Sequence, residues 1–329
     1  MLILDANDVR RALPMAETVA AMKRAFASFS AGTAEVPLRS HLPIPPHEGR
    51  SLFMPAYLRD ETGEALAVKI VSIFPHNLER DLPLIHAAVL VLEANSGRVM
   101  ALLEGGALTA IRTGAASGAA TDLLARSDCQ VAAIFGAGVQ SRTQLEAICT
   151  VRSIKTIWVY DPDQERVADF IQEKSGLDPI PSDMRSAGNP QQAVSQADII
   201  CCATTSPTPV FNDQDLKAGV HINGVGSYTQ EMQEVPSETV QHAQVIVDSR
   251  QATMSEAGDI LQPIQEGLFT KEDIHAELGE ILAGKKPGRT DSNQITFFKS
   301  VGIAVQDAAA AQLALHNAQK MGLGRKVPL

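Results

Sequence analysis

The sequence lacks several features that would assign it to common protein classes. Acidic residues outnumber basic ones, 38 to 28, and the formal net charge of -10 argues against a general polyanion binder such as a DNA-coating protein. No stretch approaches the ~18 consecutive apolar residues of a membrane-spanning helix. The opening MLILDANDVR has no basic segment followed by an apolar run, so we expect no signal peptide. These absences favour a soluble, cytoplasmic protein that binds neither nucleic acid nor membrane.

Cysteine is scarce, and its spacing predicts neither a disulfide nor a metal site. Cys129, Cys149, Cys201 and Cys202 form no CxxC pair and have no histidines at metal-ligand spacing. Cys201 and Cys202 are adjacent in an apolar run, so in a strand their side chains would point to opposite faces. We therefore expect buried free thiols in a reducing cytosol, and no metal. The sequence also lacks a nucleophile elbow, an HExxH motif and a P-loop.

The hydrophobic pattern of the first hundred residues predicts one helix followed by a sheet. Residues 15–32 have the three- and four-residue spacing of an amphipathic helix, which ends at Gly32. A proline-rich stretch follows, and then come short apolar runs at 51–56, 65–74 and 86–93. These runs, separated by turn residues, predict an antiparallel or mixed sheet.

Beyond residue 108 the pattern changes to alternating helices and strands. Residues 108–125 are small and low in charge, which predicts a closely packed connecting helix. The strand VAAIFGAG (131–138) follows, and then helices and strands at 139–150, 155–161, 163–174, 189–196, 197–203, 219–225 and 243–248. This alternation predicts an α/β fold with a doubly wound parallel sheet. The Ala-rich tail, 301–321, reads as one long helix that we expect to return to the first domain.

Residues 131–161 carry the pattern of a dinucleotide-binding unit. GAGVQS (136–141) is a GxGxx[GAS] turn between an apolar strand and a helix. The glycines let the backbone approach a pyrophosphate, and the helix N-terminus offers N–H groups and a positive dipole. Asp161 follows the next strand about 20 residues later, where an acid binds ribose hydroxyls and favours NAD over NADP. The alternative is an ordinary glycine turn with a helix-capping Asp161.

Three cations stand where the pattern would not place them. Lys69 lies inside the apolar run AVKIVSIF, Arg112 lies among small residues, and Arg39 lies in the proline-rich loop. A buried cation needs an anion or solvent, so these side chains could converge on a substrate carboxylate. Alternatively, Lys69 lies on an exposed strand face and Arg112 forms a structural salt bridge. Asp307, the lone carboxylate of the Ala-rich helix, pairs with Lys69, contacts a substrate amine or forms a simple structural ion pair.

Several segments together resemble the ornithine cyclodeaminase/mu-crystallin family. They occur in order along residues 1–320: VKIVSIFPHN (68–77), LTAIRTGAASGAATDLLA (108–125), IFGAGVQSRTQLEAI (134–148), ADIICCATTSPTPVF (197–211), HINGVGSYTQEMQEV (221–235) and ITFFKSVGIAVQDAAAA (295–311). The resemblance implies a discontinuous α+β domain for substrate binding and dimerisation, residues 1–118 plus 301–329. It also implies an inserted NAD(P)-binding Rossmann domain, residues 119–300, an active site in the cleft, and a homodimer.

The resemblance further implies roles for particular residues. Arg39, Lys69 and Arg112 fall on positions that hold the substrate carboxylate, and Lys69 and Arg112 are the predicted catalytic residues. Tyr228 and Asp307 are predicted to contact the substrate as well. The predicted cofactor-binding positions are Thr113, Gly136, Gly138, Val139, Gln140, Asp161, Thr204 and Gly226.

Two departures from the family pattern bear on the reaction. Ornithine cyclodeaminases have an aspartate where this sequence has Tyr228, and a threonine near the substrate where it has Leu84. A phenol, with a reference pKa near ~10, does not replace a carboxylate base at neutral pH. The sequence therefore favours NAD(P)H-dependent reduction of a small cyclic imino acid, Δ1-pyrroline-2-carboxylate or Δ1-piperideine-2-carboxylate, to the L-amino acid.

Three other activities remain open at this point. The first is an NAD-dependent ornithine cyclodeaminase, which forms L-proline and ammonia. The second is an alanine dehydrogenase-like enzyme, and the third is a nucleotide-binding protein without turnover. The expected cofactor is NAD(H), with NADP(H) as the alternative.

Overall fold

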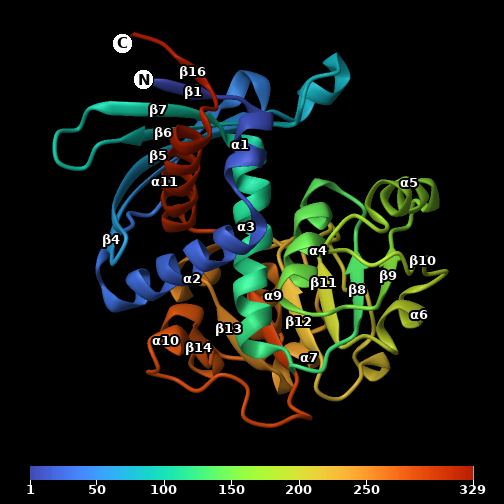
Figure 1. The fold of residues 1–329 in the computed structure, drawn as a ribbon. Helices are drawn as coiled ribbons and strands as arrows, with labels where there is room; N and C mark the ends of the chain where they lie inside the picture. The colour runs from blue at the N-terminus through green and yellow to red at the C-terminus, as the bar shows by residue number, and fades with distance from the viewer. Residues whose placement is uncertain (329) are drawn as a thin grey trace. The chain divides into compact units, whose positions relative to one another are not determined.

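The computed structural model describes residues 1–328, which divide into two compact units (Figure 1). Unit 1 comprises residues 1–112 and 303–328, and unit 2 comprises Thr113–Gly302. Helix α3 (Gly105–Leu124) contains the first boundary between the units. No helix in residues 1–328 is long and apolar enough to cross a membrane.

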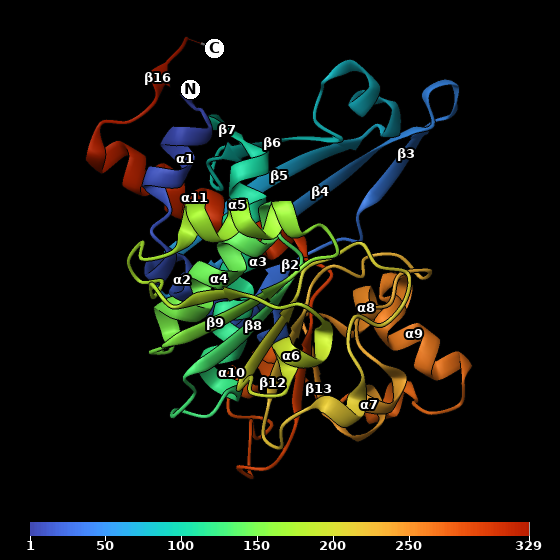
Figure 2. The ribbon, with the colours of Figure 1, turned by 90° about the vertical axis from the view of Figure 1, so that its right-hand side faces the viewer.

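Unit 1 is built on an eight-stranded, mainly antiparallel sheet, which confirms the sheet predicted for this part of the chain. Its order is β16 (Arg325–Lys326), β1 (Leu2–Leu4), β7 (Val99–Glu104), β6 (Ile85–Leu92), β5 (Gly63–Ile73), β4 (Gly49–Asp60) and β2 (Ala34–Glu35), with β3 (Ser40–Ile44) also paired to β4. Figure 2 shows β3 running beside β4 at the edge of this sheet. Two short 3-10 helices, η1 (Pro45–His47) and η2 (Pro75–Arg80), lie at the ends of these strands.

Three helices complete unit 1: α1 (Ala6–Ala12), α2 (Met15–Ala31) and α11 (Ala304–Met321). Helix α2 ends, as predicted, at Gly32, whose φ of 74° suits glycine. Helix α11 packs on α2, β4 and β5. Along β5 the buried residues alternate, so Ala65, Ala67 and Lys69 share a buried face while Ile70 on the other face is 41% exposed.

Unit 2 has the predicted doubly wound parallel sheet. The strand order is β10 (Met184–Ser186), β9 (Thr156–Tyr160), β8 (Val131–Phe135), β11 (Ile199–Cys202), β12 (His221–Gly224), β15 (Thr296–Lys299), β13 (Gln244–Val247) and β14 (Ala276–Glu277). The chain starts at β8, proceeds outward through β9 and β10, and then returns to β11 on the other side of β8. Ligands of such sheets bind at this reversal, outside the carboxyl ends of the strands.

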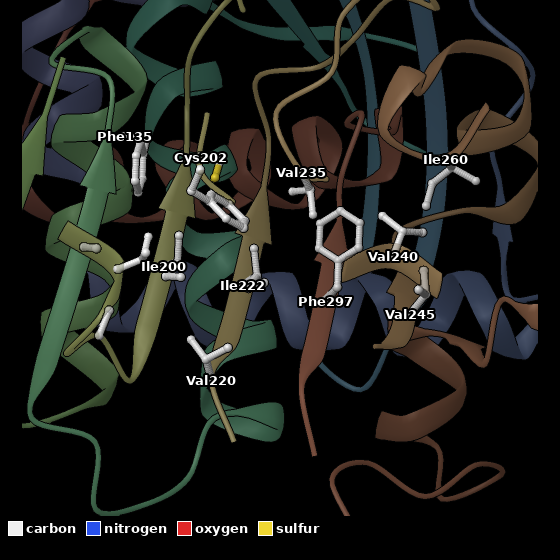
Figure 3. Packing of buried hydrophobic residues seen from close by; sticks show 14 of the residues in the cluster. Phe135, Ile200, Cys202, Val220, Ile222, Val235, Val240, Val245, Ile260 and Phe297 are labelled. Carbon is white, nitrogen blue, oxygen red and sulfur yellow. The ribbon is translucent and has the colours of Figure 1, made fainter. Parts of the chain in front are cut away.

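Short helices and two apolar layers surround this sheet. The helices are α4 (Val139–Val151), α5 (Gln164–Lys174), α6 (Pro190–Val194), α7 (Ser237–His242), α8 (Arg250–Glu256), α9 (Gly258–Gln265), α10 (Leu278–Leu282), η3 (Asp213–Asp215) and η4 (Lys271–Asp273). Cys202 packs with Phe135 and Phe297 in one layer (Figure 3), whereas Cys201 packs in the other with Phe170. All four cysteines are free and buried, as predicted, and the adjacent pair points to opposite faces.

Candidate active site

The unexpected cations and the lone helix carboxylate meet in unit 1. Lys69 Nζ lies 2.7 Å from Asp307 Oδ2, and Arg112 Nε donates to Asp307 Oδ1 at 2.9 Å. Lys69 reaches Asp307 because it lies on the face of β5 that α11 covers. All three side chains are buried, with Asp307 0% exposed. Two cations therefore share one carboxylate.

Gln306, which the sequence reasoning missed, also belongs to this cluster. Its Oε1 accepts a hydrogen bond from Arg112 Nη1 at 2.5 Å. Its Nε2 is buried and has no hydrogen-bond partner within residues 1–328. A buried N–H without an acceptor is costly, so this donor favours an oxygen ligand beside the cations. Its position next to Asp307 in the Ala-rich helix is the sequence feature that could have identified Gln306 as part of the site.

The electrostatics of the cluster favour binding of an anion. Burial lowers the pKa of Lys69 to about 8, although its ion pair with Asp307 opposes that shift. The charges of Arg112 and Arg39 lower it further, so Arg39, half-buried before β3, acts on the same site. Burial would raise the pKa of Asp307, but Arg112 and Lys69 outweigh it and the pKa is lowered. The site thus retains a positive surplus at neutral pH.

The glycine turn of unit 2 has the geometry of a dinucleotide site. Gly136, with φ 93°, follows β8, and a Cβ there would lie 2.7 Å from the carbonyl oxygen of Ala203. Gly138 begins α4, and no side chain of the described residues caps this helix. Val139 is 69% exposed. An uncapped N-terminus with room for close approach fits a pyrophosphate.

Asp161 lies at the carboxyl end of β9, beside this turn. Its Oδ2 accepts the Ala137 N–H at 3.0 Å, and its Oδ1 accepts the Asp163 N–H at 3.0 Å. The guanidinium of Arg166 is 4.0 Å from Asp161 Oδ2. The carboxylate therefore holds the turn in place, and Arg166 adds a positive charge next to the predicted ribose position.

Gln140 and Thr113 lie near the same turn. Gln140 Oε1 is buried and has no hydrogen-bond partner in the described part of the chain. Thr113 is half-buried on α3, next to Gly114. A Cβ on Gly114 would lie 2.4 Å from the carbonyl oxygen of Thr143 in α4, so the middle of α3 packs tightly on the helix that starts at the glycine turn.

Thr204 and Gly226 lie next to each other after β11 and β12. A Cβ on Gly226 would be 2.1 Å from the carbonyl oxygen of Thr204. Both donate backbone N–H groups, at 2.6 Å, to the carboxylate of Glu234, another residue that the sequence reasoning missed. Tyr228 follows in the same loop and is 37% exposed.

The structure thus groups the predicted residues into two sets. Arg39, Lys69, Arg112 and Asp307 converge in unit 1, and the predicted cofactor positions border the carboxyl edge of the sheet in unit 2. Their roles in binding and catalysis remain predictions. The sequence reasoning also missed Asp259, which accepts the backbone N–H of Glu234, and Lys299, which donates to Asp259. Lys299 had the signal that singled out Lys69, a lone cation in an apolar strand.

Comparisons with known proteins identify relatives of the whole chain. The model of the ornithine cyclodeaminase/mu-crystallin family matches residues 1–322. The chain is 40% identical over 331 residues to a Δ1-pyrroline-2-carboxylate reductase of Bacillus cereus, covering 99% of each chain. It matches the structure of Thermococcus litoralis Δ1-pyrroline-2-carboxylate reductase in complex with NADH and L-proline with a TM-score of 0.93 and 42% identity, covering 99% of this chain and 100% of that one. An archaeal alanine dehydrogenase dimer with bound NAD gives a TM-score of 0.90 at 30% identity, covering 100% of this chain and 99% of that one.

Proposed function

Because this chain belongs to the ornithine cyclodeaminase/mu-crystallin family, we propose that it reduces a small cyclic imino acid to the L-amino acid with NAD(H). The substrate is Δ1-pyrroline-2-carboxylate or its six-membered homologue, Δ1-piperideine-2-carboxylate. The observation that carries the proposal is the pairing of two buried cations with one carboxylate in unit 1. The similarity to two Δ1-pyrroline-2-carboxylate reductases supports the substrate class.

The residues of unit 1 supply binding and a proton. Arg112 and Lys69, with Arg39, bind the substrate carboxylate and so orient the C=N bond. Lys69 has a pKa of about 8, so near neutral pH its Nζ both carries a proton and can release it to the imine nitrogen. Protonation makes the imine carbon electrophilic, and NAD(H), when bound, supplies the hydride. One hydride and one proton convert the C=N bond into CH–NH.

The residue at position 228 favours reduction over ornithine cyclisation. A cyclodeaminase has to activate an amine and expel ammonia, which calls for a carboxylate base. Tyr228 offers a phenol instead, and it is 37% exposed. Reduction of an iminium ion needs no strong base, so the proposed reaction is compatible with this substitution.

We also propose that the protein is a homodimer that works in the cytoplasm. The face of the unit 1 sheet opposite Lys69 carries exposed apolar side chains, among them Leu42 at 52% and Ile70 at 41%. Exposed apolar side chains gathered on one sheet face suit a subunit contact, and the similar alanine dehydrogenase is a dimer. Four free, buried thiols suit a reducing compartment. Sedimentation at several protein concentrations tests the dimer.

The decisive experiment follows reduced nicotinamide by absorbance. Purified protein is mixed with NADH or NADPH and either Δ1-pyrroline-2-carboxylate or Δ1-piperideine-2-carboxylate, and ammonia release from L-ornithine is measured in parallel. We expect cofactor oxidation in step with imine and no ammonia. Release of ammonia with no net change in NAD would replace the proposal with a cyclodeaminase. Reduction of NAD+ to NADH with L-alanine as the only other substrate would indicate an alanine dehydrogenase. Nucleotide binding without any turnover would indicate a binding protein.

A further inference from the structure

A fully buried ion network lies behind the carboxyl ends of β11 and β12. Glu234, Asp259 and Lys299 are each 0% exposed. Asp259 Oδ2 lies 2.9 Å from Lys299 Nζ. Asp259 Oδ1 accepts the backbone N–H groups of Glu234 at 2.6 Å and Val235 at 3.1 Å. The Asp259–Lys299 pair therefore fixes the backbone that carries Glu234.

The carboxylate of Glu234 connects two loops from different strands. Its Oε1 accepts the N–H of Thr204, and its Oε2 accepts the N–H of Gly226 at 2.6 Å and that of Ser227 at 3.1 Å. The first loop follows β11 and the other follows β12. Hydrogen bonds to an ionised acceptor are stronger than neutral ones, so one side chain sets the separation of the two loops.

Apolar packing keeps water away from this network. Val235 and Ile260, which follow Glu234 and Asp259 in the chain, lie in the same cluster as Phe297 (Figure 3). Burial and the charge of Asp259 raise the pKa of Glu234 to about 7, against the opposing effect of Lys299 and of the hydrogen bonds from Thr204. Ionisation of Glu234 at neutral pH therefore depends on these partners.

The place of the two loops indicates which half of the cofactor they meet. In a doubly wound sheet the dinucleotide crosses the carboxyl edge at the strand reversal, with its pyrophosphate at the first glycine turn. Asp161, after β9, lies on the adenosine-ribose side of that turn. The nicotinamide half of the cofactor is therefore expected to extend over β11 and β12, where Thr204 and Gly226 lie.

We propose that Glu234 is a positioning residue that fixes the Thr204 and Gly226 loops for the nicotinamide half of the cofactor. This inference rests on the proposed function, because it assumes that unit 2 binds NAD(H). It assigns Glu234 no contact with substrate or cofactor. We expect its effect to be larger on the nicotinamide half, because its hydrogen bonds go to Thr204, Gly226 and Ser227, whereas the glycine turn meets this loop through the packing of Gly136 on Ala203.

The test compares two ligands that differ by the nicotinamide ring. In Glu234→Gln the amide presents N–H groups toward backbone N–H groups, so at least one hydrogen bond is lost. We expect NADH affinity to fall about tenfold, the equivalent of one buried hydrogen bond, while ADP-ribose affinity changes less than about twofold. The blue shift of bound-NADH fluorescence should shrink as well. Glu231→Gln, an exposed change in the same loop, is the matched control and should alter neither affinity.

Each outcome of these titrations bears on the proposal. An equal loss for NADH and ADP-ribose would overturn it in favour of a general structural role, and so would unchanged NADH binding. If Glu234→Gln does not fold, as judged by circular dichroism, Glu234→Asp replaces it, because it retains the charge but has a shorter side chain. The same difference is expected, with a loss of NADH affinity and little change in ADP-ribose affinity. The titrations need no imine, so failure of the proposed reduction would appear in the wild-type turnover assay and not in them.

Discussion

Each unit buries a cluster of charged side chains, and the two clusters differ in how their charges are balanced. In unit 1, Lys69 and Arg112 share the single carboxylate of Asp307. In unit 2, two carboxylates share Lys299, and all four of their oxygens have partners in the protein. The first cluster keeps an unpartnered buried N–H on Gln306, within the described residues, whereas in the second cluster every carboxylate oxygen accepts a hydrogen bond from the protein.

This difference helps to distinguish buried charges with a structural role from those that bind a ligand. A buried ion is costly unless its charge and its hydrogen bonds are satisfied. A cluster that satisfies itself stabilises and positions its own backbone, as the network of Glu234, Asp259 and Lys299 does. A cluster that keeps a buried hydrogen-bond donor without an acceptor beside an excess of cations, as that of Lys69, Arg112 and Gln306 does, is suited to bind an anionic ligand. We therefore expect loss of Lys299 to act mainly on stability and loss of Arg112 to act mainly on substrate binding.

The largest effect is expected from Lys299→Met. This change leaves two buried carboxylates without a cation, and breaking a buried pair costs about 3–5 kcal/mol of unfolding free energy. Urea unfolding followed by circular dichroism measures the loss. Lys217→Met is the matched control: Lys217 is 2.6 Å from Asp198, but its side chain is 43% exposed, so a loss below about 1 kcal/mol is expected. Equal losses of unfolding free energy in Lys299→Met and Lys217→Met would contradict the expected difference between a buried and an exposed ion pair.

The next effect is a loss of catalysis in Arg112→Ala. Removing a charged hydrogen-bond donor from the carboxylate site should cost about 3 kcal/mol, or roughly 100-fold in kcat/KM for the imine. NADH affinity should stay unchanged, because Arg112 belongs to the cluster of unit 1. Steady-state kinetics measure kcat/KM, and a titration with NADH measures its affinity. Arg98→Ala, an exposed change in the same unit, serves as control, and unchanged kinetics in Arg112→Ala would refute the carboxylate role.

A third prediction uses pH to neutralise Lys69. Its pKa of about 8 means that the cation is present below pH 8 and is lost above it. The inhibition constant of pyrrole-2-carboxylate, whose charge is constant in this range, should therefore rise about tenfold between pH 7 and pH 9. Lys69→Arg stays charged and should give a flat profile. A flat profile for the wild-type protein would show that the Lys69 charge does not hold the carboxylate.

The smallest effect is expected from Asp161→Ala. Asp161 resembles Glu234 in being buried and in accepting backbone N–H groups, two in its case, but it lies beside the glycine turn, where the ribose is predicted to bind. NADH affinity should fall about three- to tenfold more than NADPH affinity, because only NADH has a free 2′-hydroxyl on its adenosine ribose for this carboxylate. Asp163→Ala, which removes the cap of α5, is the control. An equal loss for both cofactors would contradict the ribose assignment.

Much of the fold was predictable because local signals and tertiary structure agree. Gly32 ends α2, the alternation in β5 marks its buried face, and the glycine turn joins β8 to α4 as expected. Strand β15 (Thr296–Lys299) was missed, although it lies between β12 and β13. Its apolar residues run almost directly into the Ala-rich segment 301–321, so the sequence pattern did not separate the strand from the helix, and its neighbours in the sheet define it.

Site residues could be predicted where a charged side chain lies in an apolar stretch of sequence. Lys69 stood out as a charge in an apolar strand, and Asp307 as a carboxylate in an Ala-rich helix. Glu234 could not be found in this way, because it lies among polar residues that read as an exposed loop. Its burial comes from contacts with Thr204 and Asp259, which are far away in sequence, and no local pattern reports such contacts.

The cluster in unit 1 also has a consequence for folding during synthesis. Asp307 is 195 residues beyond Arg112, so the two cations have no carboxylate partner until those residues have been synthesised. Helix α11, which covers β4 and β5, arrives equally late. Contacts of such long sequence separation form slowly, and an incomplete sheet exposes apolar surface that aggregates. We expect unit 1 to complete its folding only after α11 has been synthesised, so a truncation before Asp307 should reduce the recovery of active protein.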